Sequence, residues 1–274
     1  MIKIENVEVF GWEHAIRGMR NPMNSWEKSD SWYQKCSETH CQECANSGGE
    51  GVCLLRSDDN TRVYKFGEND KELMMKLANG GPVHAKYRRM ITVYVDITAP
   101  LYWWKEFDTY KVGTVANSCS TMHKIHEKEF TIDDFSCEHL VDIGNPHCVA
   151  NYPNDEGGID GWGPFDIMHL IIESLNKNRK NFIEATEQKS SHAKKYWWQM
   201  IQLLPSSYNQ KRTVMLNYEV LVGVYKWRKE HKLDEWREFC KWIEQLPYSE
   251  IITGMDLTVL NKDFVIPKEE NDNE

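Results

Sequence analysis

The sequence has 274 residues, of which 41% are hydrophobic and 27% are charged, a balance typical of a soluble globular chain with a full core. Its formal net charge of −9 argues against a sequence-independent nucleic-acid binder, because such a protein needs a basic face. No apolar run is long enough to span a bilayer. No secretion signal is visible, so we expect the eight cysteines to be reduced thiols in a cytoplasm.

The first part of the chain mixes predicted strands and helices. A short apolar strand over residues 7–10 precedes a helix that ends at Asn21-Pro22, because the residue before a proline disfavours helical angles. Residues 28–66 are rich in Ser, Gly and Asp, which indicates a loop insertion. Residues 68–79 form a predicted helix that ends before two glycines and a proline.

A β-branched and aromatic run, "MITVYVDI", then predicts a buried strand. Thr98 is a candidate N-cap for a helix that has Pro100 in its first turn and runs to about Tyr110. The polar stretch "EFDTYKVGTVANSCSTMH", residues 106–123, comes next. Since it follows a buried strand and helix directly, it is either a plain surface loop or a loop that lines a ligand.

The rest of the chain is predicted to be mainly helical. Residues 130–164 carry many Asn, Pro, Gly and Asp residues and are expected to be irregular. Apolar residues at helical spacing then predict four helices. These cover about residues 163–188, 191–203, 211–230 and 233–245. The predicted fold class is therefore α+β.

Four cysteines lie in the insertion, namely Cys36, Cys41, Cys44 and Cys53. Cys41-x-x-Cys44 supplies two thiolates within one turn, which is the usual chelating unit for tetrahedral zinc. The other spacings match no standard finger, so a structural zinc, free reduced thiols and redox pairing all stay open. We expect the insertion to be an accessory to a single domain over residues 1–260, and the acidic tail 261–274 to be disordered.

Two separated parts of the chain resemble the flavin-dependent thymidylate synthases. They are "VHAKYRRMITVYVDITAPLYWWKEFDTYKVGTVANSCSTMH", and "LLPSSYNQKRTVMLNYEVLVGVYKWR" with the "EHKLDEWREF" that follows. The family has a histidine, a strand ending in Ala-Pro, a helix ending in Arg-His-Arg and a polar loop. It then has Leu-Pro, an Asn-x-Arg-x-Leu helix and an arginine. The positions in register are His84, Ala99-Pro100, Leu204-Pro205, Asn217, Leu221 and Arg228.

The chain also departs from the family pattern. Tyr110 and Lys111 stand at the last two positions of Arg-His-Arg, so one of these cations remains. In the loop that follows, Asn117 and Ser120 recover the family's Asn and Ser if one residue is inserted. Without the insertion, Cys119 takes the place of the serine. The arginine of that loop is missing in both registers.

The resemblance implies an enzyme that moves a one-carbon unit from methylenetetrahydrofolate to dUMP and reduces it with a flavin hydride, in a homotetramer. It implies FAD, a pyrimidine deoxynucleotide and folate as ligands. The residues implied at the pyrimidine as catalytic are Arg228, Cys119 and Ser120. Those implied to hold the flavin are His84, Tyr110, Lys111, Asn117 and Asn217, and those implied to hold the nucleotide are Glu106, Arg17, Arg20 and Arg228.

Two other functions stay open beside this enzyme. With the Arg-His-Arg motif lost, the same fold could bind a nucleotide without flavin chemistry. The cysteine-rich insertion could instead be the contact surface of a zinc-stabilised structural or interaction protein. Bound flavin would favour the enzyme. Stabilisation by a nucleotide in protein without bound flavin would favour the nucleotide-binding protein. Loss of both zinc and partner binding in Cys41→Ser would favour the zinc-stabilised protein.

Overall fold

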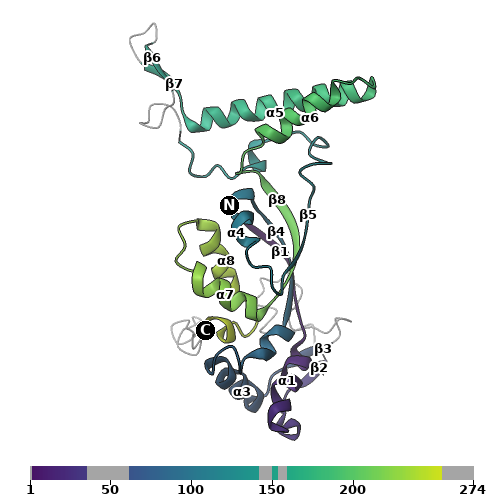
Figure 1. Ribbon diagram of the computed structural model, residues 1–274. Coiled ribbons are helices and arrows are strands. Elements are labelled where there is room, and N and C mark those ends of the chain that lie inside the picture. Colours follow the sequence, from purple (N-terminus) through teal and green to yellow (C-terminus); the bar gives the residue numbers. More distant parts are fainter. Residues whose placement is uncertain (1, 36–61, 142–149, 154–158, 255–274) are drawn as a thin grey trace, which may run out of the picture. The chain divides into compact units, whose positions relative to one another are not determined.

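The computed structural model describes residues 2–35, 62–141, 150–153 and 159–254, and its elements are drawn in Figure 1. The largest sheet has four strands in the order β1-β4-β8-β5. These strands are β1 (Lys3–Phe10), β4 (Thr92–Pro100), β8 (Asn209–Asn217) and β5 (Val115–Ser118). Two antiparallel hairpins complete the described strands: β2 (Trp32–Lys35) with β3 (Arg62–Lys65), and β6 (Ala150–Pro153) with β7 (Ile159–Trp162).

Strand–helix alternation in the first part and long helices later confirm the predicted α+β class. The α-helices within the described ranges are α1 (Trp12–Arg20), α3 (Glu68–Asn79), α4 (Leu101–Phe107), α5 (Pro164–Glu187), α6 (Ala193–Leu203), α7 (Tyr218–Arg228), α8 (Asp234–Glu244) and α9 (Glu250–Thr253). The predictions of α1, α3, α5, α6, α8 and the strand β4 are confirmed. No helix in the described ranges has both the length and the apolar character that crossing a membrane requires.

The predicted helix over residues 211–230 is wrong in its first third. Residues 209–217 form the strand β8, and the helix α7 begins only at Tyr218. Along β8 the buried residues Gln210, Val214 and Leu216 are separated by even numbers of positions, as in a strand with one face on a core. The helix starts where Asn217 has an extended backbone and its side chain accepts a hydrogen bond from Val220 N–H, at 3.1 Å.

Other boundaries also differ from the prediction. Thr98 is not an N-cap, because β4 continues through Pro100 and Pro100 is itself the N-cap residue of α4. The helix α4 ends at Phe107 rather than near Tyr110. The stretch 106–123 therefore holds the end of a helix, a turn and the strand β5. The insertion 28–66 begins and ends in the paired strands β2 and β3, and residues 130–164 contain the β6–β7 hairpin.

The described chain divides into two compact units. The first comprises the described residues within Met1–Glu5, Asp96–Lys111 and Ala116–Val214, and the second those within Asn6–Val95, Val112–Val115 and Met215–Glu274. All four strands of the main sheet have residues in both units. The expected single domain over residues 1–260 stays a prediction, and the tail 261–274 lies outside the described residues.

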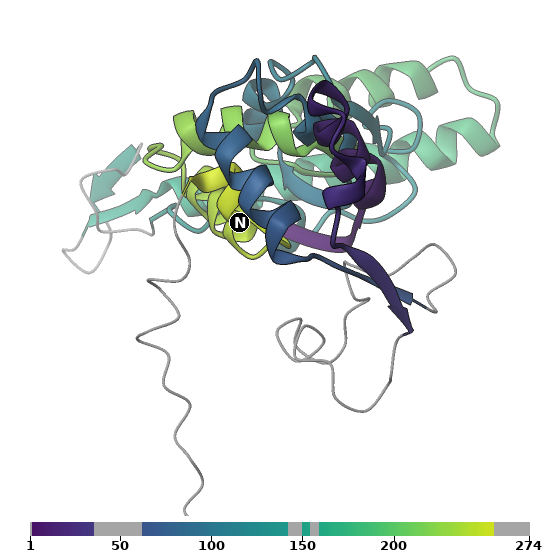
Figure 2. The same cartoon turned by 90° about the horizontal axis from the view of Figure 1, so that it is seen from below.

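The core of the first unit lies between the helices α5 and α6 and the segment that follows β5. Leu175 of α5 and Met200 of α6 are fully buried, and both pack in one cluster with Phe130 and Phe135. Figures 1 and 2 show α5 and α6 side by side along their length. The cluster closes one side of the cavity described below.

The core of the second unit is built from helices. On α8 the buried residues Trp236, Phe239, Cys240 and Ile243 recur at helical spacing, as an amphipathic helix requires. On α1, Trp12 is buried, and its ring lies 5.3 Å from that of Tyr218 in an edge-to-face contact. Trp12 of α1 thus packs against Tyr218 of α7, and α8 buries one apolar face.

Candidate functional site

The polar stretch after α4 is held by buried aromatic residues on one side and is open on the other. Trp103, Trp104 and Phe107 of α4 are all buried. The strand β5 that follows has exposed side chains along its whole length. Between them, Gly113 has φ +79°, a left-handed conformation that favours glycine. A Cβ there would also lie 2.8 Å from Nδ2 of Asn217, so this turn needs a glycine on two counts.

Cys119 and Ser120, directly after β5, have well-defined backbones. The amide N–H of Cys119 donates to the carbonyl of Lys211 at 2.9 Å, and the Cys119 carbonyl accepts from Nε2 of Gln210 at 2.7 Å. The Ser120 hydroxyl oxygen accepts from the amides of Met122 and His123, at 3.2 and 2.9 Å. These bonds turn the chain while the Cys119 side chain stays exposed.

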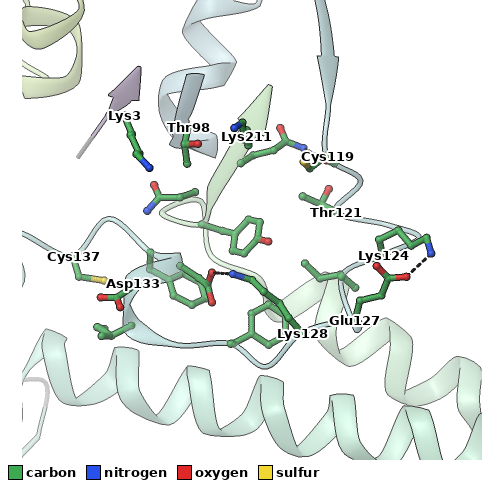
Figure 3. Close-up of a pocket in the computed structure, with 18 of the residues that line it drawn as sticks. Lys3, Thr98, Cys119, Thr121, Lys124, Glu127, Lys128, Asp133, Cys137 and Lys211 are labelled. Carbon is green, nitrogen blue, oxygen red and sulfur yellow. Dashed lines mark hydrogen bonds and ion pairs between the residues drawn. The ribbon is translucent and has the colours of Figure 1, made fainter. Parts of the chain in front are cut away.

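A cavity of about 1040 Å³ opens beside this segment, entirely within the first unit (Figure 3). Cys119, Ser120 and Thr121 line it on one side, and the segment from Lys124 to Glu138 lines it on another. The remaining walls come from Lys3, Thr98, Phe165 and residues 208–211. This volume is sufficient for a drug-sized or nucleotide-sized ligand.

Part of the cavity wall is aromatic. The ring of Tyr208 lies 5.7 Å from that of Phe135 and 6.3 Å from that of Phe130, both in edge-to-face contacts. Burial, with smaller contributions from the charges of Asp134 and Cys119, raises the pKa of Tyr208 above its usual value. Tyr208 therefore presents a neutral phenol and an aromatic ring to the cavity at physiological pH.

The charges around the cavity are balanced and largely paired. Lysines and carboxylates each contribute four lining residues, namely Lys3, Lys124, Lys128, Lys211, Glu127, Asp133, Asp134 and Glu138. Lys128 pairs with Asp134, and Lys124 with Glu127 (Figure 3). Because the lining is neutral overall, an anionic ligand would have to displace or share these partners.

Lys211 holds the most elaborate of these ion pairs. Its ammonium group lies 3.1 Å from Oδ2 of Asp96 and 3.7 Å from Oε2 of Glu5. The hydrogen bond to Asp96, more than any other contact, raises the pKa of Lys211, while Lys3 and Lys211 lower that of Glu5. The Asp96 carboxylate also accepts from the Thr213 hydroxyl at 2.6 Å. Lys211 thus remains charged and oriented on β8.

The predicted site residues of the first unit lie on one continuous stretch. Cys119 and Ser120 line the cavity, while Glu106 lies near the end of α4 and is half-buried. Lys111 is exposed in the turn and Asn117 is exposed on β5. Tyr110 is half-buried, and its ring lies 6.5 Å from that of Phe107. The ligand roles of these residues stay predictions.

The predicted site residues of the second unit are placed differently. Arg17 and His84 are exposed. Arg20 is buried, and its Nε donates to Oδ1 of Asp70 at 2.6 Å. Asn217 caps α7, as described above. The guanidinium carbon of Arg228 lies 4.7 Å from the centre of the Trp236 ring, a cation–π contact. The structure thus gives Arg20, Asn217 and Arg228 structural contacts, and their ligand roles stay predictions.

The predicted zinc ligands Cys36, Cys41, Cys44 and Cys53 lie outside the described residues. Within the described ranges, no group of three or more His, Cys, Asp or Glu side chains is arranged to hold a metal ion. The sequence also failed to place Gln210 and Tyr208 at the cavity, because the residues that follow them were predicted to be a helix rather than the strand β8. The even spacing of buried positions along 210–216 was the signal that could have corrected this interpretation.

Comparison with known proteins gives the fold. No protein-family model and no curated protein sequence matches the chain. Among solved structures, thymidylate synthase X from Helicobacter pylori with FAD and dUMP matches with a TM-score of 0.52 and 14% identity, over 92% of this chain and 97% of that chain. A second structure, of flavin-dependent thymidylate synthase ThyX from Helicobacter pylori complexed with FAD and dUMP, matches with a TM-score of 0.53 and 15% identity. This match covers 91% of this chain and 97% of that chain. The chain therefore has the fold of the flavin-dependent thymidylate synthases, on a widely divergent sequence.

Proposed function

We propose that this protein is a divergent flavin-dependent thymidylate synthase-like enzyme that binds a pyrimidine deoxynucleotide and FAD and uses a folate as one-carbon donor. Cys119 and Ser120 carry the proposal, because the register of the resemblance puts them at the pyrimidine and they line the 1040 Å³ cavity. The matching solved structures, which hold FAD and dUMP, support the choice of ligands.

The residues near β5 fit a flavin in part. An isoalloxazine ring needs a flat and partly apolar surface, and Val112 and Val115 are 91% and 57% exposed beside the turn. Lys111 is exposed and can meet a phosphate as a point charge, without the bidentate fork of an arginine. When bound, the flavin would supply the hydride. The chain's own residues would bind and orient the nucleotide and exclude water from it.

On the nucleotide side, the cavity offers aromatic rings and small polar groups. Tyr208 and Phe130 provide apolar surface for a base or a ribose. The Cys119 thiol and the Ser120 hydroxyl can face the polar edges of such a ligand, and Lys211 is the cation of β8 that lines the cavity. Since Lys211 is already paired with carboxylates, we expect its contribution to phosphate binding to be weak.

The test is a set of three measurements on the purified protein. We expect a yellow flavin absorbance or FAD binding at micromolar concentration, a rise in melting temperature with dUMP, and release of tritium from dUMP labelled at C5 when folate and a reductant are present. Cys119→Ala should weaken the dUMP effect, whereas the exposed α5 variant Lys177→Ala should not. Protein that binds neither FAD nor dUMP refutes the proposal.

Two observations favour a second function, nucleotide binding without flavin chemistry. Lys111 is the only basic residue at the position of the family's Arg-His-Arg, and the amide oxygen of Asn217 is used to cap α7. A dUMP-dependent rise in melting temperature in protein that neither retains nor takes up FAD would identify this function. Binding of FAD would exclude it.

We extend the proposal to a homotetramer. The family resemblance supports it, and Trp227, 70% exposed on α7, is a candidate residue for a contact between subunits. Light scattering of the full chain should give four times the monomer mass, and a monomer at micromolar concentration would contradict this part of the proposal.

A further inference from the structure

Arg212 occupies an unusual position on β8, next to the cavity-lining residues 208–211. Its guanidinium carbon lies 4.1 Å from the centre of the Trp104 ring, and Nη1 donates to Oδ1 of Asp108 at 2.7 Å. Its Nε donates to Oε1 of Gln210 at 3.0 Å. The side chain is only 14% exposed, so Arg212 is committed to these contacts rather than to solvent.

The contact with Gln210 determines which way that amide points. An arginine has only donors, so the Gln210 oxygen must face Arg212 and the Gln210 NH₂ must face away from it. On that other side Nε2 donates to the carbonyl of Cys119 at 2.7 Å. Gln210 is buried, and the indole N–H of Trp104 donates to its backbone carbonyl at 2.9 Å. The orientation of one buried amide therefore connects Arg212 to Cys119.

We propose that Arg212 is a positioning residue that acts through Gln210 to hold Cys119 and Ser120 in the conformation that lines the cavity. Its importance for the ligand rests on the proposed function. The planar guanidinium stacks on Trp104 while its edge donates to both Asp108 and Gln210. A lysine cannot reproduce this, because its ammonium is a single point charge that does not stack in a plane.

Two substitutions break the connection at different points. Arg212→Lys removes the planar fork, so the Gln210 amide loses the group that orients it. Gln210→Glu keeps a partner for Arg212, now as an ion pair, but it turns a carboxylate oxygen toward the Cys119 carbonyl and abolishes that hydrogen bond. Gln210→Glu therefore removes the side-chain hydrogen bond to the Cys119 carbonyl without removing the Arg212 contact. Arg237→Lys is the matched control, because Arg237 also pairs with an aspartate, Asp234, but belongs to the second unit.

The readout is hydrogen exchange of two peptides from the first unit, residues 116–123 and residues 166–175 of α5. Loss of one hydrogen bond worth about 1 kcal/mol should speed exchange in the first peptide about fivefold. We expect this in Arg212→Lys and Gln210→Glu but not in Arg237→Lys, with the α5 peptide unchanged in all three. Unchanged exchange over 116–123, or equal acceleration in both peptides, overturns the inference.

Titration with dUMP in the same variants connects the inference to the ligand. We expect its affinity to fall by up to about fivefold in Arg212→Lys and Gln210→Glu. Arg212→Lys is the cleaner test, because Gln210 lines the cavity itself whereas Arg212 does not. Faster exchange with unchanged dUMP affinity overturns the link between this segment and the nucleotide. If the unmodified protein binds no dUMP, the proposed function fails, while the exchange data still decide whether Arg212 positions Cys119.

Discussion

The buried ion pair of Arg20 and Asp70 offers the sharpest test of how the second unit is held together. Nε of Arg20 donates to Oδ1 of Asp70, and both side chains are almost completely buried, at 4% and 0% exposure. The other oxygen, Oδ2, accepts from the Ser29 and Ser31 hydroxyls at 2.8 and 2.7 Å, and from the amides of Asp30 and Ser31 at 3.1 and 3.0 Å. Asp70 thus ties the segment 29–31 to α3.

The perturbation is Asp70→Asn. It keeps the shape of the side chain but replaces one acceptor oxygen by an NH₂ group and removes the charge opposite Arg20. Breaking a buried pair in this way costs about 3–5 kcal/mol, because the remaining charge is left buried. For a chain of this size we therefore expect the melting temperature to fall by roughly 10 °C.

The assay is urea unfolding of the unmodified protein, Asp70→Asn, Arg20→Met and the double variant. We expect the double variant to be more stable than the sum of the single effects predicts, because it contains no orphaned charge. Arg17→Met, at an exposed position of the same helix, should change the free energy of unfolding by less than about 0.5 kcal/mol. An Asp70→Asn cost below about 1 kcal/mol, or strict additivity, would refute the reasoning.

Further predictions concern pH, a helix cap and the core. Burial opposes ionisation of Asp70, but hydrogen bonds from Ser31, Ser29 and Arg20 outweigh it and lower its pKa. The ionised Asp70 therefore stabilises the fold above its unfolded pKa of about 3.9, and this stabilisation is lost as pH falls through the lower folded pKa. As pH is lowered below about 4, the urea midpoint should therefore fall less in Asp70→Asn than in the unmodified protein. Asn217→Ala should cost about 1 kcal/mol by circular dichroism melting, and Asn217→Ser less, because serine can also cap α7. Met200→Ala, at a fully buried site, should cost about 2–5 kcal/mol in urea, whereas the exposed Lys195→Ala should be neutral; equal effects would contradict the described core.

Local periodicity was sufficient for the elements that bury one face along their length. The helix α8 buries Trp236, Phe239 and Ile243 at helical spacing, and β4 buries alternate residues from Val93 to Ala99. These patterns are properties of short windows, so they are visible without knowledge of the partner surface. The same approach failed at β8, because its apolar residues run directly into α7 and their strand conformation depends on pairing in the sheet.

The residues of the candidate site were likewise predicted only in part from the sequence. The register of two separated segments predicted that Cys119 and Ser120 face a ligand, and they line a cavity. It could not indicate that Tyr208 and Gln210 would join them, since their positions depend on how β8 pairs with its neighbours in the sheet. Nor could it indicate that Asp70, fifty positions further along the chain, pairs with the predicted ligand residue Arg20.

By itself, therefore, the sequence determined the α+β class, most helices, the strand before Ala99-Pro100 and the resemblance in fold. These depend on local spacing and on motifs that keep their order along the chain. Only the tertiary structure decided which polar side chains have partners, because a hydrogen bond or ion pair depends on distances between residues far apart in sequence. The arginines illustrate this: Arg17 remains in solvent, Arg20 is used in a buried pair, and Arg212 orients the amide that holds Cys119.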